Sequence, residues 1–129
     1  MKFQKILVVD DSPTELHMVI DILNRHKIPE IVTATNGLDA VAKAESEKPD
    51  LILMDVVMPE MNGFQATRKI KKNPDTADIP VNIISSKDQE TDKVWGKRQG
   101  ANEYLTKPVK EAELIKVMES LKATCPAIH

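Results

Sequence analysis

The sequence has 129 residues, the length of one domain, so we expect a single domain over residues 1–129. Hydrophobic residues make up 41% and charged residues 29%, a composition that excludes a disordered chain. The formal net charge of −2 argues against a nucleic-acid partner, and the single cysteine excludes an internal disulfide.

The chain carries no sign of membrane insertion or export. Its longest apolar runs, at 6–9 and 51–54, are far too short to span a bilayer. The first residues lead directly into a strand-like run, without the pattern of a signal peptide. We therefore expect a cytoplasmic protein. Its four glycines form neither a Walker A loop nor a dinucleotide fingerprint, which excludes the commonest nucleotide-binding classes.

Short apolar runs recur along the chain and predict strands. They show little alternation of polar and apolar residues, which is typical of strands covered on both faces. The predicted strands are 5–9, 31–34, 51–54, 81–84 and 103–106.

Helical patterns fill the intervals between these runs. Residues 12–15, Ser-Pro-Thr-Glu, have the sequence of a capping box with proline at the first helical position. We expect the basic residues at 68, 69, 71 and 72 to form a solvated helix face. For Trp95 we favour burial in the packing of the fourth helix, with a partly exposed anchor on a partner surface as the alternative. The predicted helices are 13–23, 38–45, 64–71, 88–99 and 111–121, followed by a frayed tail at 122–129.

Regular alternation of strand and helix predicts an α/β fold, with five parallel strands and helices on both faces of the sheet. In such sheets ligands bind beyond the carboxyl ends of the strands. The polar residues at those ends are Asp10, Asp11, Asp55, Ser85 and Lys107. The sequence therefore predicts that these side chains meet at one edge of the sheet.

The predicted cluster has a definite chemistry. Crowded carboxylates repel one another until a proton or a cation relieves the repulsion, and oxygen ligands of this kind suit Mg²⁺. Lys107 adds a fixed positive charge, and a metal beside an ammonium forms a site for a phosphoryl group. No catalytic triad or Cys-His pair is available, so the candidate nucleophile is a carboxylate that forms an aspartyl-phosphate. Asp55, alone at its strand end, is the best candidate.

Over residues 4–121 the chain resembles the receiver domain of two-component response regulators. The resemblance implies a flavodoxin-like, doubly wound sheet with strand order 2-1-3-4-5. Within the family, residues 87–108 are similar to those of regulators of twitching motility. The motifs that carry the resemblance are Asp10-Asp11, Asp55, Met58-Pro59, 61–63 (Met-Asn-Gly), Ser85, Tyr104 and Lys107-Pro108.

The resemblance also implies the role of each residue at the metal site. Asp55 is the expected phosphoacceptor. Asp11 and Asp55 are expected to bind Mg²⁺ through their carboxylates, Val57 through its backbone carbonyl, and Asp10 through a water molecule. Val57 also stands at a position that, with Lys87, influences the rate of dephosphorylation in the family.

Three further residues are implied to respond to phosphorylation. Lys107 is expected to pair with Asp55 before modification and with the phosphoryl oxygens afterwards, and its peptide bond to Pro108 is expected to be cis. Ser85 is expected to donate its hydroxyl group to the phosphoryl group. Tyr104 either rotates inward behind Ser85 or simply packs against the helices, and both readings stay open.

By the same resemblance the chain is a stand-alone response regulator and not an enzyme. A histidine kinase is the expected phosphoryl donor, and a target protein is expected to bind the surface of the fourth helix, fifth strand and fifth helix. A phosphate sink for another regulator is an alternative. Less favoured are a Mg²⁺-dependent aspartyl-phosphate phosphatase, a flavin-binding module and a scaffold with an inactive site.

Overall fold

The computed structural model describes residues 3–87 and 89–124 and contains a five-stranded sheet. The strands lie in the order β2-β1-β3-β4-β5, and every neighbouring pair is parallel. The predicted α/β class and strand order are confirmed. The strands are β1 (Lys5–Val9), β2 (Glu30–Ala34), β3 (Leu51–Met54), β4 (Val81–Ser85) and β5 (Glu103–Thr106).

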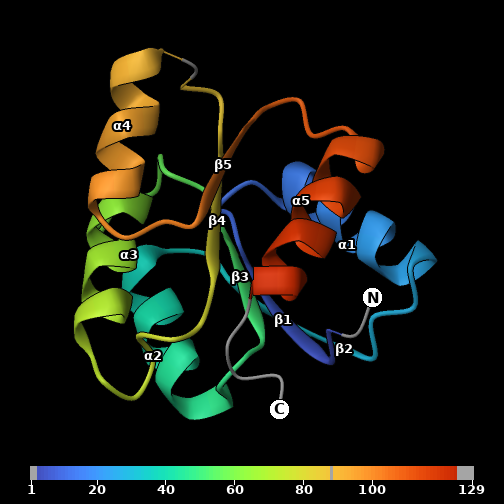
Figure 1. The fold of residues 1–129 in the computed structure, drawn as a ribbon, viewed down its shortest axis with the longest axis horizontal. Coiled ribbons are helices and arrows are strands. Elements are labelled where there is room, and N and C mark those ends of the chain that lie inside the picture. Colours follow the sequence, from blue (N-terminus) through green and yellow to red (C-terminus); the bar gives the residue numbers. More distant parts are fainter. Residues whose placement is uncertain (1–2, 88, 125–129) are drawn as a thin grey trace.

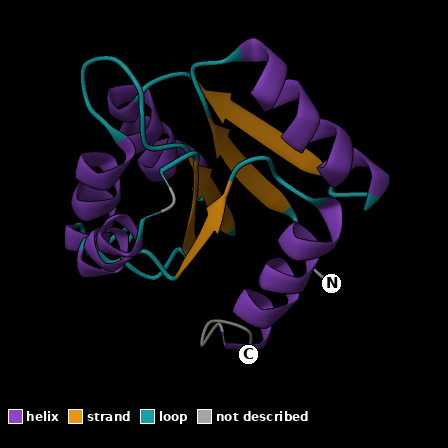
Figure 2. Cartoon of the chain, turned by 90° about the horizontal axis from the view of Figure 1, so that it is seen from above, coloured by secondary structure: helices purple, strands orange, loops and turns teal. Residues whose placement is uncertain are grey.

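Five helices cover the sheet in two layers. Figure 1 shows α2, α3 and α4 on one face and α1 and α5 on the other, and Figure 2 shows the same layers from above. The last helix continues past the expected end at Leu121, and residues 125–129 of the expected tail lie outside the described residues. The helices are α1 (Pro13–Arg25), α2 (Gly37–Glu47), α3 (Gly63–Lys72), α4 (Glu90–Arg98) and α5 (Glu111–Thr124).

The apolar runs form strands because both of their faces are buried. Successive side chains of a strand point to opposite faces of the sheet, so each central strand contributes to two cores. Residues of the core beneath α2, α3 and α4 include Leu7, Val9, Ile52, Met54 and Ile83. Residues of the core beneath α1 and α5 include Ile6, Val8, Leu51, Leu53 and Ile84.

The start of α1 departs from the predicted capping box. The Ser12 hydroxyl oxygen accepts a hydrogen bond from the Glu15 backbone N–H at 3.4 Å, so half of the motif is present. The Ser12 backbone N–H donates to Asp10 Oδ1 at 2.9 Å, and the Glu15 carboxylate accepts from Lys107. An ammonium is a stronger partner for a carboxylate than a backbone N–H. The prediction of a complete capping box was therefore wrong.

The outer surface of α4 carries the chain's single tryptophan. The sequence predicts burial of Trp95, but the structure places it 49% exposed beside Val94, which is 48% exposed. The helix rests on the sheet through Gly96 instead, where a Cβ atom would lie 3.0 Å from Tyr104 Cδ2. The ring of Tyr104 occupies the space under α4, so Trp95 is turned outward.

Lys71 also differs from the expectation of a solvated helix face. Its ammonium donates hydrogen bonds to the carbonyl oxygens of Ala77 and Ile79 and to Asn102 Oδ1, at 3.3, 2.6 and 3.0 Å. Burial lowers the pKa of Lys71. Arg68, Lys69 and Lys72 on the same helix are exposed, as predicted. Within the described part of the chain, no helix has the length and apolar character that a bilayer span needs.

Candidate functional site

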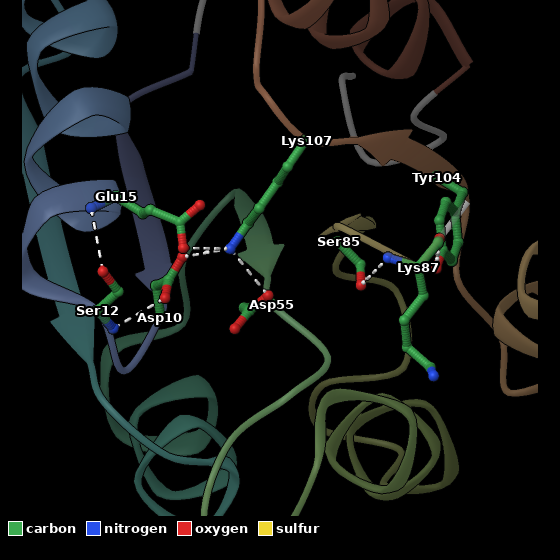
Figure 3. Close-up of polar contacts among 8 residues, drawn as sticks. All are labelled: Asp10, Ser12, Glu15, Asp55, Ser85, Lys87, Tyr104 and Lys107. Carbon is green, nitrogen blue, oxygen red and sulfur yellow. Dashed lines mark hydrogen bonds and ion pairs between the residues drawn. The ribbon is translucent and has the colours of Figure 1, made fainter.

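Three strand ends meet at one edge of the sheet and bring together side chains from distant parts of the chain. Asp10 follows β1, Asp55 follows β3, and Lys107 follows β5. The backbone N–H of Asp10 donates to the Ala34 carbonyl and that of Asp55 to the Val9 carbonyl, so both residues continue the sheet ladder. Their carboxylates are buried and face one another across the site (Figure 3).

The Lys107 ammonium is the centre of this arrangement. It lies 3.0 Å from Asp10 Oδ2, 2.9 Å from Glu15 Oε2 and 3.1 Å from Asp55 Oδ1 (Figure 3). The ammonium donates hydrogen bonds to Asp10 and Glu15 and forms an ion pair with Asp55. The expected pairing of Lys107 with Asp55 is present, and the Lys107–Pro108 peptide bond is cis, as expected.

The electrostatics of the site leave it with excess negative charge. Burial, and after it the charge of Asp10, raises the pKa of Asp55 to about 6, although Lys107 acts to lower it. Burial lowers the pKa of Lys107, but its hydrogen bonds to Glu15 and Asp10 and the charge of Asp55 raise it more, so the net pKa is raised. Lys107 therefore stays charged, while the carboxylates still favour an additional cation.

The expected metal ligands are grouped as the sequence predicts. Asp10, Asp11 and Asp55 each present a carboxylate oxygen, and these oxygens lie within 4.8 Å of one another. Hard oxygen ligands of this kind, with space left for water and phosphate, fit Mg²⁺. Val57 lies in the loop after Asp55 with its side chain 61% exposed. The metal-binding role of its backbone carbonyl stays a prediction.

The loop after Asp55 folds back tightly over the strand end. A Cβ atom on Gly63 would lie 2.0 Å from the Asp55 carbonyl oxygen, so any residue larger than glycine would force the backbone to shift. The Gly63 N–H donates to the Val56 carbonyl at 2.9 Å, and Asn62 and Gln65 form a capping box at the start of α3. The Met-Asn-Gly motif thus places the start of α3 directly against the backbone of Asp55.

Ser85 and Tyr104 are linked to each other through the loop after β4. The Ser85 hydroxyl oxygen accepts a hydrogen bond from the Lys87 N–H at 3.1 Å. The Tyr104 hydroxyl group donates to the Lys87 carbonyl at 2.7 Å. Figure 3 places Ser85 across the site from Asp10, with Asp55 and Lys107 between them. The structure brings Ser85 to the site edge as predicted, and its switch role with Tyr104 stays a prediction.

Glu15 is a member of the site that the sequence analysis missed. It was assigned to the helix cap, whereas its carboxylate binds Lys107. One signal was available, because Glu15 stands in the first turn of α1, directly after the strand end that carries Asp10 and Asp11. Only the fold shows that Lys107, far away in the sequence, reaches this turn.

The chain matches the response regulator receiver domain family over residues 6–119. Protein PilH of Pseudomonas aeruginosa (strain PAO1) is 56% identical over 119 residues, which cover 92% of this chain and 98% of PilH. Protein PilG of the same organism is 36% identical over 123 residues, which cover 95% of this chain and 88% of PilG.

Solved structures show the same relationship. The receiver domain of a Pseudomonas aeruginosa sensor histidine kinase, with a magnesium ion coordinated in the active site cleft, matches with a TM-score of 0.85 at 28% identity and covers 95% of this chain and 100% of that one. The Vibrio cholerae chemotaxis protein CheY4 matches with a TM-score of 0.85 at 31% identity. That match covers 93% of this chain and 99% of CheY4. This chain therefore belongs to the family of response regulator receiver domains.

Proposed function

We propose that this protein is a response regulator in which Asp55 accepts a phosphoryl group from a histidine kinase. The observation that carries the proposal is the ion pair between the buried Asp55 carboxylate and Lys107, set beside the Asp10–Asp11–Asp55 oxygen cluster. Membership of the receiver family supports it, since receiver domains are signalling domains that take phosphoryl groups from histidine kinases.

The proposed transfer is a single displacement at phosphorus. An Asp55 carboxylate oxygen attacks the phosphorus atom, the P–N bond to the kinase histidine breaks, and its electron pair returns to the imidazole nitrogen. Lys107 remains paired with the acceptor and binds a phosphoryl oxygen. Asp11, Asp55 and the Val57 carbonyl would hold Mg²⁺, with Asp10 acting through water, and the bound ion supplies positive charge that offsets the negative charge of the phosphoryl group.

The added group brings about −1.5 to −2 units of charge to the Ser85 side of the site. We propose that Ser85 donates its hydroxyl group to it and that Tyr104 transmits the change to the surface formed by α4, β5 and α5. A target protein would recognise that surface. The similarity to PilH and PilG supports a role in the control of twitching motility, and we propose that the protein acts in the cytoplasm.

Intact-mass measurement tests the proposal. The protein is incubated with acetyl phosphate and Mg²⁺, and we expect a mass increment of one phosphoryl group that is abolished by EDTA. Asp55→Ala should show no increment, whereas Asp50→Ala removes a carboxylate that caps the start of β1, away from the site, and should retain it. An increment that persists in Asp55→Ala contradicts the assignment.

A further inference from the structure

The three anions around Lys107 are not equivalent. Asp10 and Asp55 belong to the oxygen cluster that suits a divalent cation, and both are buried. Glu15 lies outside that cluster, comes from the first turn of α1, and has a side chain that is 42% exposed. It nevertheless makes the shortest of the three contacts with the ammonium, at 2.9 Å.

Lys107 and a divalent cation have competing requirements in this site. The ammonium uses Asp10 Oδ2 and Asp55 Oδ1, two carboxylates that the cation also needs. Two positive ions that share these anions repel each other as well. A partner for Lys107 that is not a metal ligand reduces both effects, and Glu15 is positioned to be that partner.

The hydrogen bonds at the start of α1 leave Glu15 available for this contact. In a complete capping box its carboxylate would bind the Ser12 N–H. Here Asp10 Oδ1 accepts that hydrogen bond instead, at 2.9 Å. Glu15 is therefore not needed for the cap, and its carboxylate is directed toward Lys107 (Figure 3).

We propose that Glu15 is a positioning residue that holds the Lys107 ammonium on the α1 side of the site and so leaves Asp10 and Asp55 available to a divalent cation. Without Glu15, the ammonium keeps only Asp10 and Asp55 as partners and competes more strongly with the ion for them. The inference rests on the proposed function for its biological purpose, but it concerns cation binding alone.

A double-mutant cycle on Mg²⁺ affinity tests the inference, with calorimetric titration as the readout. We expect Glu15→Gln to weaken Mg²⁺ binding roughly five-fold, because the Lys107 ammonium then competes more strongly with the ion for Asp10 and Asp55. In a Lys107→Met background the same substitution should weaken it less than two-fold, because no ammonium is left to reposition. Glu15→Ala should repeat the pattern, which excludes a peculiarity of the glutamine side chain.

Asp21→Asn is the matched control. Asp21 is an exposed acid on the same helix, with no ion pair among the residues that the structure describes, so we expect its neutralisation to change Mg²⁺ affinity less than two-fold. Equal fold-changes for Glu15→Gln with and without Lys107 would show a through-space charge effect and overturn the positioning role. The positioning role is also overturned if Glu15→Gln leaves Mg²⁺ affinity unchanged in the protein that keeps Lys107. It is overturned as well if the wild-type protein does not bind Mg²⁺.

Phosphoryl uptake, measured by mass on the same proteins, separates this inference from the proposed function. If the wild-type protein gains no phosphoryl group while the cycle shows the expected coupling, the proposed function fails and the role of Glu15 stands. If uptake is normal and the cycle shows no coupling, only the role of Glu15 fails.

Discussion

Asp55 is a buried carboxylate whose charge is only partly balanced by its neighbours. Burial, and then the Asp10 charge, raise its pKa from 3.8 to about 6, although Lys107 lies 3.1 Å away. The carboxylate that we propose as the phosphoacceptor is thus held where its negative charge is unfavourable in the metal-free protein.

The raised pKa of Asp55 determines whether the protein gains or loses stability as the pH rises. The folded protein binds a proton at Asp55 more readily than the unfolded chain, so the stabilising contribution is complete below 3.8 and is lost as the pH rises to about 6. At neutral pH the ionised carboxylate is a penalty. We expect metal-free Asp55→Asn to be more stable than the wild-type protein at neutral pH by about 1–3 kcal/mol.

Urea unfolding in EDTA across that pH range measures the effect. The unfolding free energy of Asp55→Asn should also vary less between pH 4 and pH 6 than that of the wild-type protein, roughly the window between the two pKa values. Asp21→Asn, which removes an exposed carboxylate, serves as the control. A wild-type protein that is the more stable of the two at neutral pH would contradict the sign.

Asn82 is another buried polar residue. Its side chain is fully buried in β4, and neither amide atom has a hydrogen bond within the described residues. Strand alternation places it on the same face as Ile84, in the core beneath α1 and α5. A buried amide without hydrogen bonds costs stability.

We therefore expect Asn82→Leu to stabilise the protein by about 1–2 kcal/mol, because the apolar side chain has a similar shape and no unmet hydrogen bonds. The control is Asn102→Leu, since Asn102 Oδ1 accepts hydrogen bonds from the Val81 N–H and the Lys71 ammonium. That variant should lose stability in the same urea titrations. Destabilisation by both leucine substitutions would show that Asn82 has a partner in solution.

At the scale of elements, Lys71 helps to hold the connection from α3 to β4 in place. Lys71 donates to the Ala77 and Ile79 carbonyl oxygens and to Asn102 at the start of β5, so it joins a helix, a loop and a strand. Its aliphatic chain also lies against Gly100, where a Cβ atom would be 2.7 Å from Lys71 Cγ.

We expect Lys71→Met to lower the free energy of unfolding by about 1–2 kcal/mol, because the substitution removes the donor from partly buried carbonyl oxygens. Amide exchange should accelerate in residues 73–80. The neighbouring Lys72→Met removes the same charge from an exposed position and should stay within about 0.5 kcal/mol of the wild-type protein. Similar losses for both variants would show that Lys71 contributes through its charge alone.

At the scale of the whole molecule, the acidic cluster exists only in the folded chain. Asp10 and Asp11 follow β1 and Asp55 follows β3, so unfolding separates them and releases any cation they share. We expect Mg²⁺ at one hundred times its dissociation constant to raise the free energy of unfolding by about 2.7 kcal/mol.

Thermal unfolding with and without EDTA checks this expectation. Asp11→Asn should abolish most of the increase, because it removes one of the three carboxylates of the cluster. Asp11 is exposed, so its loss leaves the core unchanged. An equal increase in wild-type protein and Asp11→Asn would place the stabilising ion elsewhere on the surface.

The sequence by itself determined the order of the elements, the parallel sheet and the residues at the strand ends. Hydrophobic periodicity is local, and a parallel sheet brings Asp10, Asp55 and Lys107 to one edge wherever the helices pack. The grouping of the carboxylates followed from that placement, and the Asp55–Lys107 ion pair was implied by the resemblance to receiver domains.

Only the tertiary structure decided which partner each polar side chain takes. Glu15 binds Lys107 and not its own helix cap, Lys71 binds a neighbouring loop and not water, and Trp95 faces outward because Tyr104 fills the space under α4. These outcomes depend on distances between residues far apart in the chain. Local patterns carry no information on such distances, since they record which residues are apolar and not which side chains meet.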